Sequence, residues 1–104
     1  MMIYISAPYG GKKENKDRIE FIVKTLSIER PFDTFISPVH CWGFMYDTVA
    51  YNVGIRYCLE LLDKCDFMMV FGDWRSSRGC RLEVEHAKIN EIPFIVYEDV
   101  EGDG

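Results

Sequence analysis

The chain has 104 residues, of which 48% are apolar and 14% aromatic, so it is not a disordered segment and suits one domain with a single core. Its 12 basic and 17 acidic residues give a net charge of −5, which argues against a nucleic-acid polymer as partner because such a partner requires a basic face. No apolar run is long enough for a transmembrane helix and residues 1–5 (MMIYI) carry no secretion signal, so we expect a cytoplasmic protein without a membrane partner.

The first half of the chain alternates between strand-like and helical spacing of apolar residues. Residues 2–6 form a short apolar run that a Pro-Tyr-Gly-Gly loop follows, which predicts a buried strand. Residues 13–29 place apolar residues at i, i+3, i+4 and i+7, which predicts a helix. A second short strand is expected at 34–37, followed by an irregular aromatic stretch at 39–48.

The second half of the chain repeats this alternation. Helical spacing returns at 49–64, and residues 66–72 (DFMMVFG) form a continuous apolar run that is typical of a strand buried on both faces. A polar loop at 73–78 leads into a helix predicted at 79–91, and residues 92–97 predict a last buried strand.

This order of elements predicts an α/β fold, a three-layer Rossmann-like or flavodoxin-like domain with a parallel sheet of four to five strands. We expect residues 1–104 to form this single domain, with an acidic, frayed tail at 98–104. Ligands in such sheets bind outside the carboxyl ends of the strands, where the strand order reverses. The loops after the strands are therefore the expected place of a site.

Glu83 interrupts the apolar stripe of the last predicted helix. Cys80, Val84 and Ala87 stand at i, i+4 and i+7 of this stripe, and Glu83 takes the i+3 position. An acidic residue in the first turn interacts favourably with the helix dipole, and this explanation requires no function. The alternative is a carboxylate that points into the crevice at the strand ends as a nucleophile or base.

Three loops after predicted strands carry residues that suit a ligand. Residues 76–79 (SSRG) offer hydroxyls and free N–H groups to an anion, or act as an ordinary serine cap. Residues 10–13 (GGKK) allow close approach of a phosphate to the backbone, although the P-loop spacing is absent, and a plain turn explains them equally well. Residues 40–46 (HCWGFMY) suit stacking on a base or sugar, or a hydrophobic cluster under the loop.

Metal and disulfide chemistry are not expected. The four cysteines have no CxxC spacing, which favours reduced and mostly buried thiols. Glu83 and His86 have the spacing of half a di-iron helix motif, but such sites need a second copy and more carboxylates. We therefore expect no metal and no cofactor.

Three stretches together resemble the nucleoside 2-deoxyribosyltransferase superfamily. They are residues 3–8 (IYISAP), the pair 65–66 (CD) at the start of a buried strand, and residues 77–87 (SRGCRLEVEHA). The spacing Gly-x-x-x-Glu-x-x-x-Ala, followed by a last strand led by proline, is the most specific part, and the resemblance covers nearly the whole chain.

Two branches of this superfamily are the most similar. Small phage and bacterial members of uncharacterised function carry a stretch like residues 73–79 (DWRSSRG). The branch that hydrolyses 5-hydroxymethyl-dUMP has a Gly-Gly-basic loop like residues 10–12 and a serine six residues before the catalytic glutamate, as Ser77 is here.

The resemblance implies roles for residues of this chain. Glu83 would be the nucleophile on the anomeric carbon, and Tyr4 would hold and tune its carboxylate. The implied substrate-binding residues are Ser6, Pro8, Tyr9, Gly10, Gly11, His40, Trp42, Asp73, Ser77 and Gly79. Of these, the glycines and Ser77 would contact a 5′-phosphate or 5′-hydroxyl, and His40 and Trp42 would lie near the sugar or base.

The chain departs from the transferases at three places. Ser77 stands where they have an acid, which favours a nucleotide over a nucleoside. Cys58 stands where they have an aspartate that serves the leaving base or the sugar, and Glu60 and Asp63 are close in sequence but on other helix faces. Unless another acid replaces this aspartate, the leaving base lacks a proton donor. The C-terminal segment that reaches a neighbouring subunit in the transferases is only residues 99–104 here.

We therefore expect an N-glycosidase or deoxyribosyltransferase-like enzyme that cleaves the N-glycosidic bond of a nucleoside 5′-monophosphate. The alternative is a non-catalytic nucleotide-binding module, such as a sensor or a sequestering protein. A phosphoribohydrolase of the cytokinin-activating type has less support because no PGG-x-GT stretch is present. Open sheet edges and aromatic residues at 42–46 favour a homo-oligomer in which a neighbour completes the site.

Overall fold

Four parallel strands form the central layer of the domain. They are β1 (Met2–Ser6), β2 (Thr34–Ile36), β3 (Phe67–Phe71) and β4 (Phe94–Tyr97). Their order across the sheet is β2-β1-β3-β4, and every neighbouring pair is parallel. The computed structural model describes residues 1–97, so the tail expected at 98–104 lies outside the described residues.

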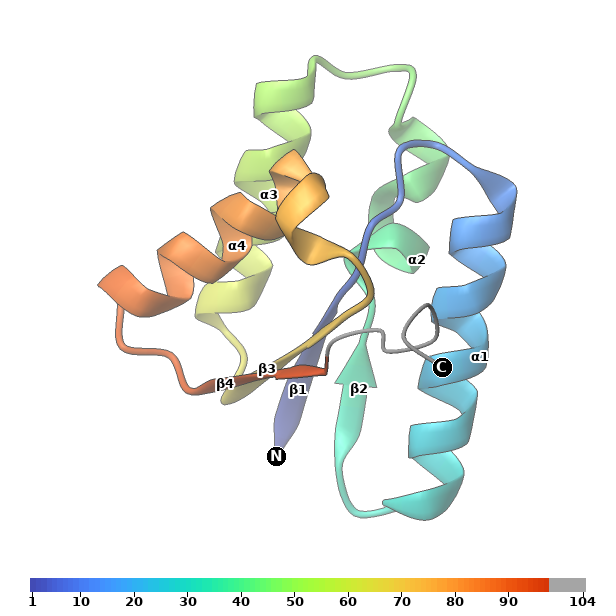
Figure 1. Cartoon of the computed structure of the whole chain (residues 1–104), viewed down its shortest axis with the longest axis vertical. Coiled ribbons are helices and arrows are strands. Elements are labelled where there is room, and N and C mark those ends of the chain that lie inside the picture. Colours follow the sequence, from blue (N-terminus) through green and yellow to red (C-terminus); the bar gives the residue numbers. More distant parts are fainter. Residues whose placement is uncertain (98–104) are drawn as a thin grey trace.

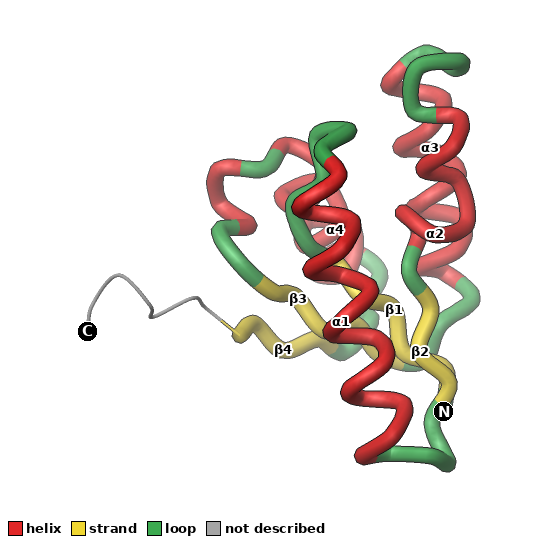
Figure 2. Tube along the Cα trace, turned by 90° about the vertical axis from the view of Figure 1, so that its right-hand side faces the viewer, coloured by secondary structure: helices red, strands yellow, loops and turns green. Residues whose placement is uncertain are grey.

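Helices cover both faces of this sheet, which confirms the predicted α/β fold with three layers. Helix α1 (Lys13–Glu29) lies on one side, and α3 (Tyr51–Asp63) and α4 (Arg78–Ile89) lie on the other (Figure 1). In the view turned by 90°, the short helix α2 (Pro38–Trp42) lies beside α3, with which it is in contact (Figure 2).

The alternation of side chains along β1 separates two hydrophobic clusters. Ile3 and Ile5 pack with Ile19 of α1 on one face of the sheet. Tyr4 packs on the other face, against the buried stripes of α3 and α4. The polar residues of β1 that matter for the site, Tyr4 and Ser6, therefore belong to the α3–α4 side.

The aromatic stretch predicted as irregular at 39–48 begins with a helix. Ser37 caps α2 by accepting a hydrogen bond from the His40 N–H at 3.3 Å, and Pro38 occupies the first turn, where its missing N–H is no loss. A 3₁₀ turn at Gly43–Met45 follows directly. The capping serine and the proline that favour a helix start are both visible in the sequence, but a helix of five residues is too short to show a helical period.

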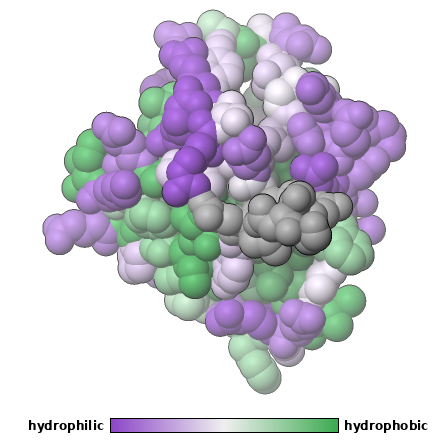
Figure 3. All heavy atoms as spheres, in the orientation of Figure 1, coloured by the Kyte–Doolittle hydropathy of each residue, from purple (hydrophilic) through white to green (hydrophobic). Residues whose placement is uncertain are grey.

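The last strand predicted at 92–97 is present at Phe94–Tyr97, but the prediction that it is buried is wrong. β4 is an edge strand on which half-buried and exposed residues alternate, with Ile95 42% and Tyr97 43% exposed. Phe94 and Val96 pack under α3 and α4, whereas Ile95 and Tyr97 point to the face of the sheet on which α1 packs and are not covered. Apolar atoms accordingly reach the surface where β4 lies in Figure 1 (Figure 3). No helix in residues 1–97 is long and apolar enough to cross a membrane.

Candidate active site

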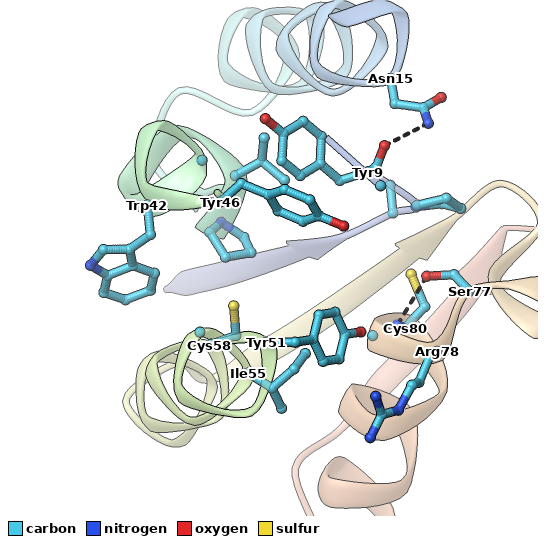
Figure 4. Close-up of a pocket in the computed structure, with 18 of the residues that line it drawn as sticks. Tyr9, Asn15, Trp42, Tyr46, Tyr51, Ile55, Cys58, Ser77, Arg78 and Cys80 are labelled. Carbon is cyan, nitrogen blue, oxygen red and sulfur yellow. Dashed lines mark hydrogen bonds between the residues drawn. The ribbon is translucent and has the colours of Figure 1, made fainter. Parts of the chain in front are cut away.

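A pocket of about 660 Å³ lies at the carboxyl ends of the strands. Its walls come from the loop after β1, from α2 and the residues after it, and from the N-terminal halves of α3 and α4 (Figure 4). Parallel strands end at the same edge of the sheet, which brings these distant segments together. The pocket has the size of an ordinary small-molecule site and lies where the strand order predicts one.

Glu83 of α4 lines this pocket from its buried side. The residue is 6% exposed. The Tyr4 hydroxyl donates a hydrogen bond to Oε2 of Glu83, and the Ser6 hydroxyl donates one to Oε1 at 2.6 Å. The inward position of Glu83 and its contact with Tyr4 are thus confirmed, and Ser6 is a second residue that orients the carboxyl.

Burial determines the protonation of these groups. It raises the pKa of the Glu83 carboxyl because the charged form loses water, while the hydrogen bonds from Ser6 and Tyr4 act in the opposite direction. Burial, and then the charge of Glu83, raise the pKa of the Tyr4 phenol well above its ordinary value of 10.0. Tyr4 therefore keeps its proton and donates a hydrogen bond to a Glu83 carboxyl that is oriented but poorly solvated.

Three basic side chains line the pocket and suit an anionic ligand. They are Lys12, Arg18 and Arg78. The first turn of α4 also faces the pocket, and its helix dipole favours an anion at this end. Ser77 caps this turn by accepting a hydrogen bond from the Cys80 N–H at 3.3 Å. A phosphate at this end of α4 would meet both the dipole and nearby cations.

Tyr46 projects into the pocket from the wall next to the loop after β1 (Figure 4). Its ring centroid is 5.2 Å from that of Tyr9 in an edge-to-face arrangement. Its ring also packs on Gly11, where a Cβ would lie 3.0 Å from Cε1 of the tyrosine. Gly11 thus leaves the space that Tyr46 occupies.

Tyr51 projects from α3 on the opposite wall (Figure 4). The Arg78 guanidinium lies 4.8 Å from its ring centroid. A Cβ at Gly79 would lie 3.3 Å from the Tyr51 hydroxyl oxygen, so the glycine permits this close packing. Tyr46 and Tyr51 therefore form two aromatic walls on either side of the pocket.

Cys58 also lines the pocket, beside the Tyr4 hydroxyl. Burial, and then the charge of Glu83, raise the pKa of the Cys58 thiol to about 12. The thiol consequently stays protonated at neutral pH. The position at which the resemblance has an aspartate therefore carries a neutral group.

A family model described as a domain of unknown function (DUF7768) matches residues 1–97. The chain belongs to this family. The match spans every residue that the structure describes, so the pocket and its catalytic candidates lie within the DUF7768 domain. No curated protein matches the chain.

Most residues predicted to bind substrate do line the pocket of this DUF7768 domain. These are Pro8, Tyr9, Gly10, Trp42, Asp73, Ser77 and Gly79. Ser6 instead holds Glu83, and Gly11 lies against the ring of Tyr46.

His40 is not among the residues that line the pocket, in contrast to its predicted place near the sugar or base. Its Nδ1 is 2.9 Å from the Ser37 hydroxyl, and its Nε2 is 3.4 Å from Glu20 of α1. The reason is helical geometry, because α2 turns Val39 and Trp42, three residues apart, to the pocket and His40 to another side.

His86 likewise does not join Glu83. Its Nε2 is 2.6 Å from a carboxyl oxygen of Asp63, which links the ends of α3 and α4. Within the described part of the chain, no group of three or more His, Cys, Asp or Glu residues could hold a metal ion.

The sequence interpretation missed several lining residues. Arg18 and Asn15 reach the pocket from α1, where their i, i+3 spacing beside the Gly-Gly loop was an available signal. Tyr51 at the start of α3 and Tyr57 in its middle offered no such signal, because an aromatic residue of a helix has the same spacing whether it lines a pocket or faces solvent.

Proposed function

We propose that the chain is an N-glycosidase or deoxyribosyltransferase-like enzyme that cleaves the N-glycosidic bond of a nucleoside 5′-monophosphate, with Glu83 as nucleophile. The observation that supports this most is the buried Glu83 carboxyl, which two hydroxyls orient inside a pocket of about 660 Å³. Glu83 lies beyond the first turn of α4, where the helix dipole has its main effect, and an acid placed for the dipole needs neither burial nor two dedicated donors. The pocket wall is where such a group can meet a substrate.

The chemistry follows from the properties of this carboxylate. Departure of the base leaves an oxocarbenium-like centre at C1′, and a poorly solvated carboxylate can form a bond to this carbon. Tyr4 and Ser6 hold the two oxygens so that the attack needs little reorientation. Attack of water on the glycosyl ester then completes hydrolysis, whereas attack of a second base completes transfer.

The preference for a nucleotide rests on the charges around the pocket. Lys12, Arg18 and Arg78 supply three cations, and the first turn of α4 with Ser77 provides a helix N-terminus. A 5′-phosphate satisfies these groups, while a nucleoside leaves them unpaired. The planar base would then lie toward Tyr46 and Tyr51, whose rings suit stacking.

A non-catalytic nucleotide-binding module is the second candidate. It is favoured by Cys58, which replaces the expected proton donor, and by the raised pKa of Glu83, since a protonated carboxyl is not a nucleophile. Such a protein would bind the same ligand in the same pocket without turnover. The homo-oligomer expected from the sequence stays a prediction in either case.

One experiment separates these functions. The protein is incubated with a panel of ribo- and deoxyribonucleoside 5′-monophosphates, and released base is measured by mass spectrometry. Base release that Glu83→Gln reduces by about 100-fold or more supports the enzyme, because the loss of a nucleophile has an effect of at least that size. The matched control is Glu85→Gln, which changes an exposed carboxyl on the same helix. Binding by calorimetry without release indicates the module, and absence of both binding and release contradicts both functions.

A further inference from the structure

Within residues 1–97, the pocket lining provides a nucleophile but no second carboxyl placed beside it. Among residues 1–97, the only carboxyl side chains in its lining are Glu83 and Asp73. Glu83 is held by Tyr4 and Ser6, and Asp73 is exposed to solvent after β3. Other acidic hydrogens of this lining belong to two cysteine thiols, including that of Cys58, and to the phenols of four tyrosines, all of them weaker acids than a carboxyl.

A pocket lining with a nucleophile but without a strong proton donor limits which bases can leave. A neutral purine or pyrimidine departs with an extra electron pair and needs a proton, which a general acid supplies for a rate gain of about 10²–10⁴. The Cys58 thiol is a poor donor at neutral pH, because burial and Glu83 raise its pKa to about 12. A base with a fixed positive charge leaves as a neutral molecule and needs no proton.

The aromatic lining favours the same class of base. Tyr9, Trp42, Tyr46 and Tyr57 line the pocket, together with Tyr51, one face of which the Arg78 guanidinium already covers. Faces of tyrosine and tryptophan rings attract cations, and cages of such rings recognise ligands with permanent positive charge. The basic residues Lys12, Arg18 and Arg78 would repel such a base and attract its phosphate, which orients a ligand that carries both charges.

We propose that the substrate is a 5′-nucleotide whose base carries a fixed positive charge, such as a pyridinium nucleotide or an N7-alkylated purine nucleotide. This inference rests on the proposed N-glycosidase function and names its substrate class. Glu83 forms a bond to C1′ while the C1′–N bond breaks and its electron pair neutralises the ring nitrogen. Water then attacks C1′, the ester bond returns its electron pair to Glu83, and one proton passes to solvent.

The test uses pairs of nucleotides that differ in the charge of the base. Guanosine 5′-monophosphate and its 7-methyl derivative differ by one methyl group and one charge, and both are assayed in ribo and deoxyribo form. Nicotinamide mononucleotide is a second cationic probe. Each rate is divided by the uncatalysed rate of the same compound, because cationic bases also leave faster in water. We expect this enhancement to be about 100-fold or more larger for the cationic member, the size of a missing general acid.

A variant adds a second readout. Cys58→Asp places a carboxyl in the pocket lining beside the Tyr4 hydroxyl and is expected to increase release of guanine from guanosine 5′-monophosphate, whereas Cys41→Asp, at an exposed position of α2, is not. Thermal denaturation checks that each variant is folded, and the comparison of substrates on the wild-type protein does not depend on either variant.

Each outcome supports or overturns the inference. Equal enhancement for neutral and cationic bases, lost in Glu83→Gln, overturns it and leaves the N-glycosidase function in place. If Asp73→Asn reduces cleavage of the neutral nucleotide alone, Asp73 is the proton donor. This result also overturns the inference and leaves the N-glycosidase function in place. Cleavage of neither class overturns both the inference and the proposed function.

Discussion

The Glu83 carboxyl lowers the stability of the fold whenever it is ionised. Its pKa is raised by burial, so the folded state binds a proton more tightly than the unfolded chain does. The contribution of Glu83 to the free energy of unfolding is therefore most favourable below the ordinary pKa of a glutamate and decreases as the pH rises through the raised pKa. A tenfold difference in proton affinity corresponds to about 1.4 kcal/mol.

We predict that Glu83→Gln removes this decrease. At pH 8 the variant is expected to unfold with a free energy at least equal to that of the wild type if the amide keeps both hydroxyl partners. Urea unfolding at pH 4 to 9 measures the difference, and the slope with pH is the decisive quantity. Glu85→Gln, at an exposed position, should leave the slope unchanged. A wild-type slope that persists in Glu83→Gln contradicts this account.

Ionisation of Glu83 is expected to increase the rate of catalysis, whereas it decreases the stability of the fold. Only ionised Glu83 can attack C1′, so base release is expected to rise with pH and to reach half of its maximum above the ordinary glutamate value of 4.5. A cationic base needs no proton donor, and the rate should then stay level up to pH 9. The kcat/KM for nicotinamide mononucleotide, whose pyridinium charge does not change with pH, measures this profile for the ligand-free enzyme. A rate that reaches half of its maximum at or below pH 4.5 contradicts the raised pKa of Glu83.

The loop after β1 depends on two glycines that can be tested as a pair. Gly10 and Gly11 have φ values of 61° and 75°, in the left-handed region, so alanine at either position should destabilise the fold by about 1 kcal/mol. A Cβ at Gly10 meets nothing within 4 Å, whereas one at Gly11 lies 3.0 Å from the ring of Tyr46. We therefore expect Gly11→Ala alone to displace this ring.

The prediction is that both variants lose similar backbone stability but differ in binding. Gly11→Ala should weaken the binding of a nucleoside monophosphate several-fold more than Gly10→Ala, because one wall of the pocket moves. Calorimetry of both variants, with urea unfolding beside it, measures the two effects. Equal affinities would show that Tyr46 does not contact the ligand.

The helices and strands also show how much of the fold and of the candidate site could be predicted from the sequence. Long elements with a clear period, such as α1 at Lys13–Glu29, agree with the prediction because packing and local preference coincide. Glu83 was found because a carboxylate in an apolar stripe is a conflict between pattern and chemistry. The burial of β4 and the direction of His40 were not predictable, since both depend on how elements pack rather than on their own residues.

At the scale of the whole molecule, the net charge and the charge of the pocket have opposite sign. Four of the 17 acidic residues lie in 98–104, so residues 1–97 carry 13 acidic and all 12 basic side chains. The described domain is thus close to neutral, and three of its cations line the pocket. An exposed charge acts over a Debye length of about 8 Å at physiological salt, so these cations outweigh the distant acids for a bound phosphate.

Salt should therefore weaken nucleotide binding. For a nucleoside 5′-monophosphate we expect the dissociation constant to increase about three- to tenfold between 20 and 200 mM NaCl, since each cation within 4 Å of a phosphate contributes about 1 kcal/mol in water, and salt reduces this. Arg78→Gln should weaken binding at low salt and flatten the dependence. Lys88→Gln, at the far end of the same helix, should do neither. If affinity instead rises with salt, repulsion by the net charge of −5 dominates, and the basic residues of the pocket do not hold the phosphate.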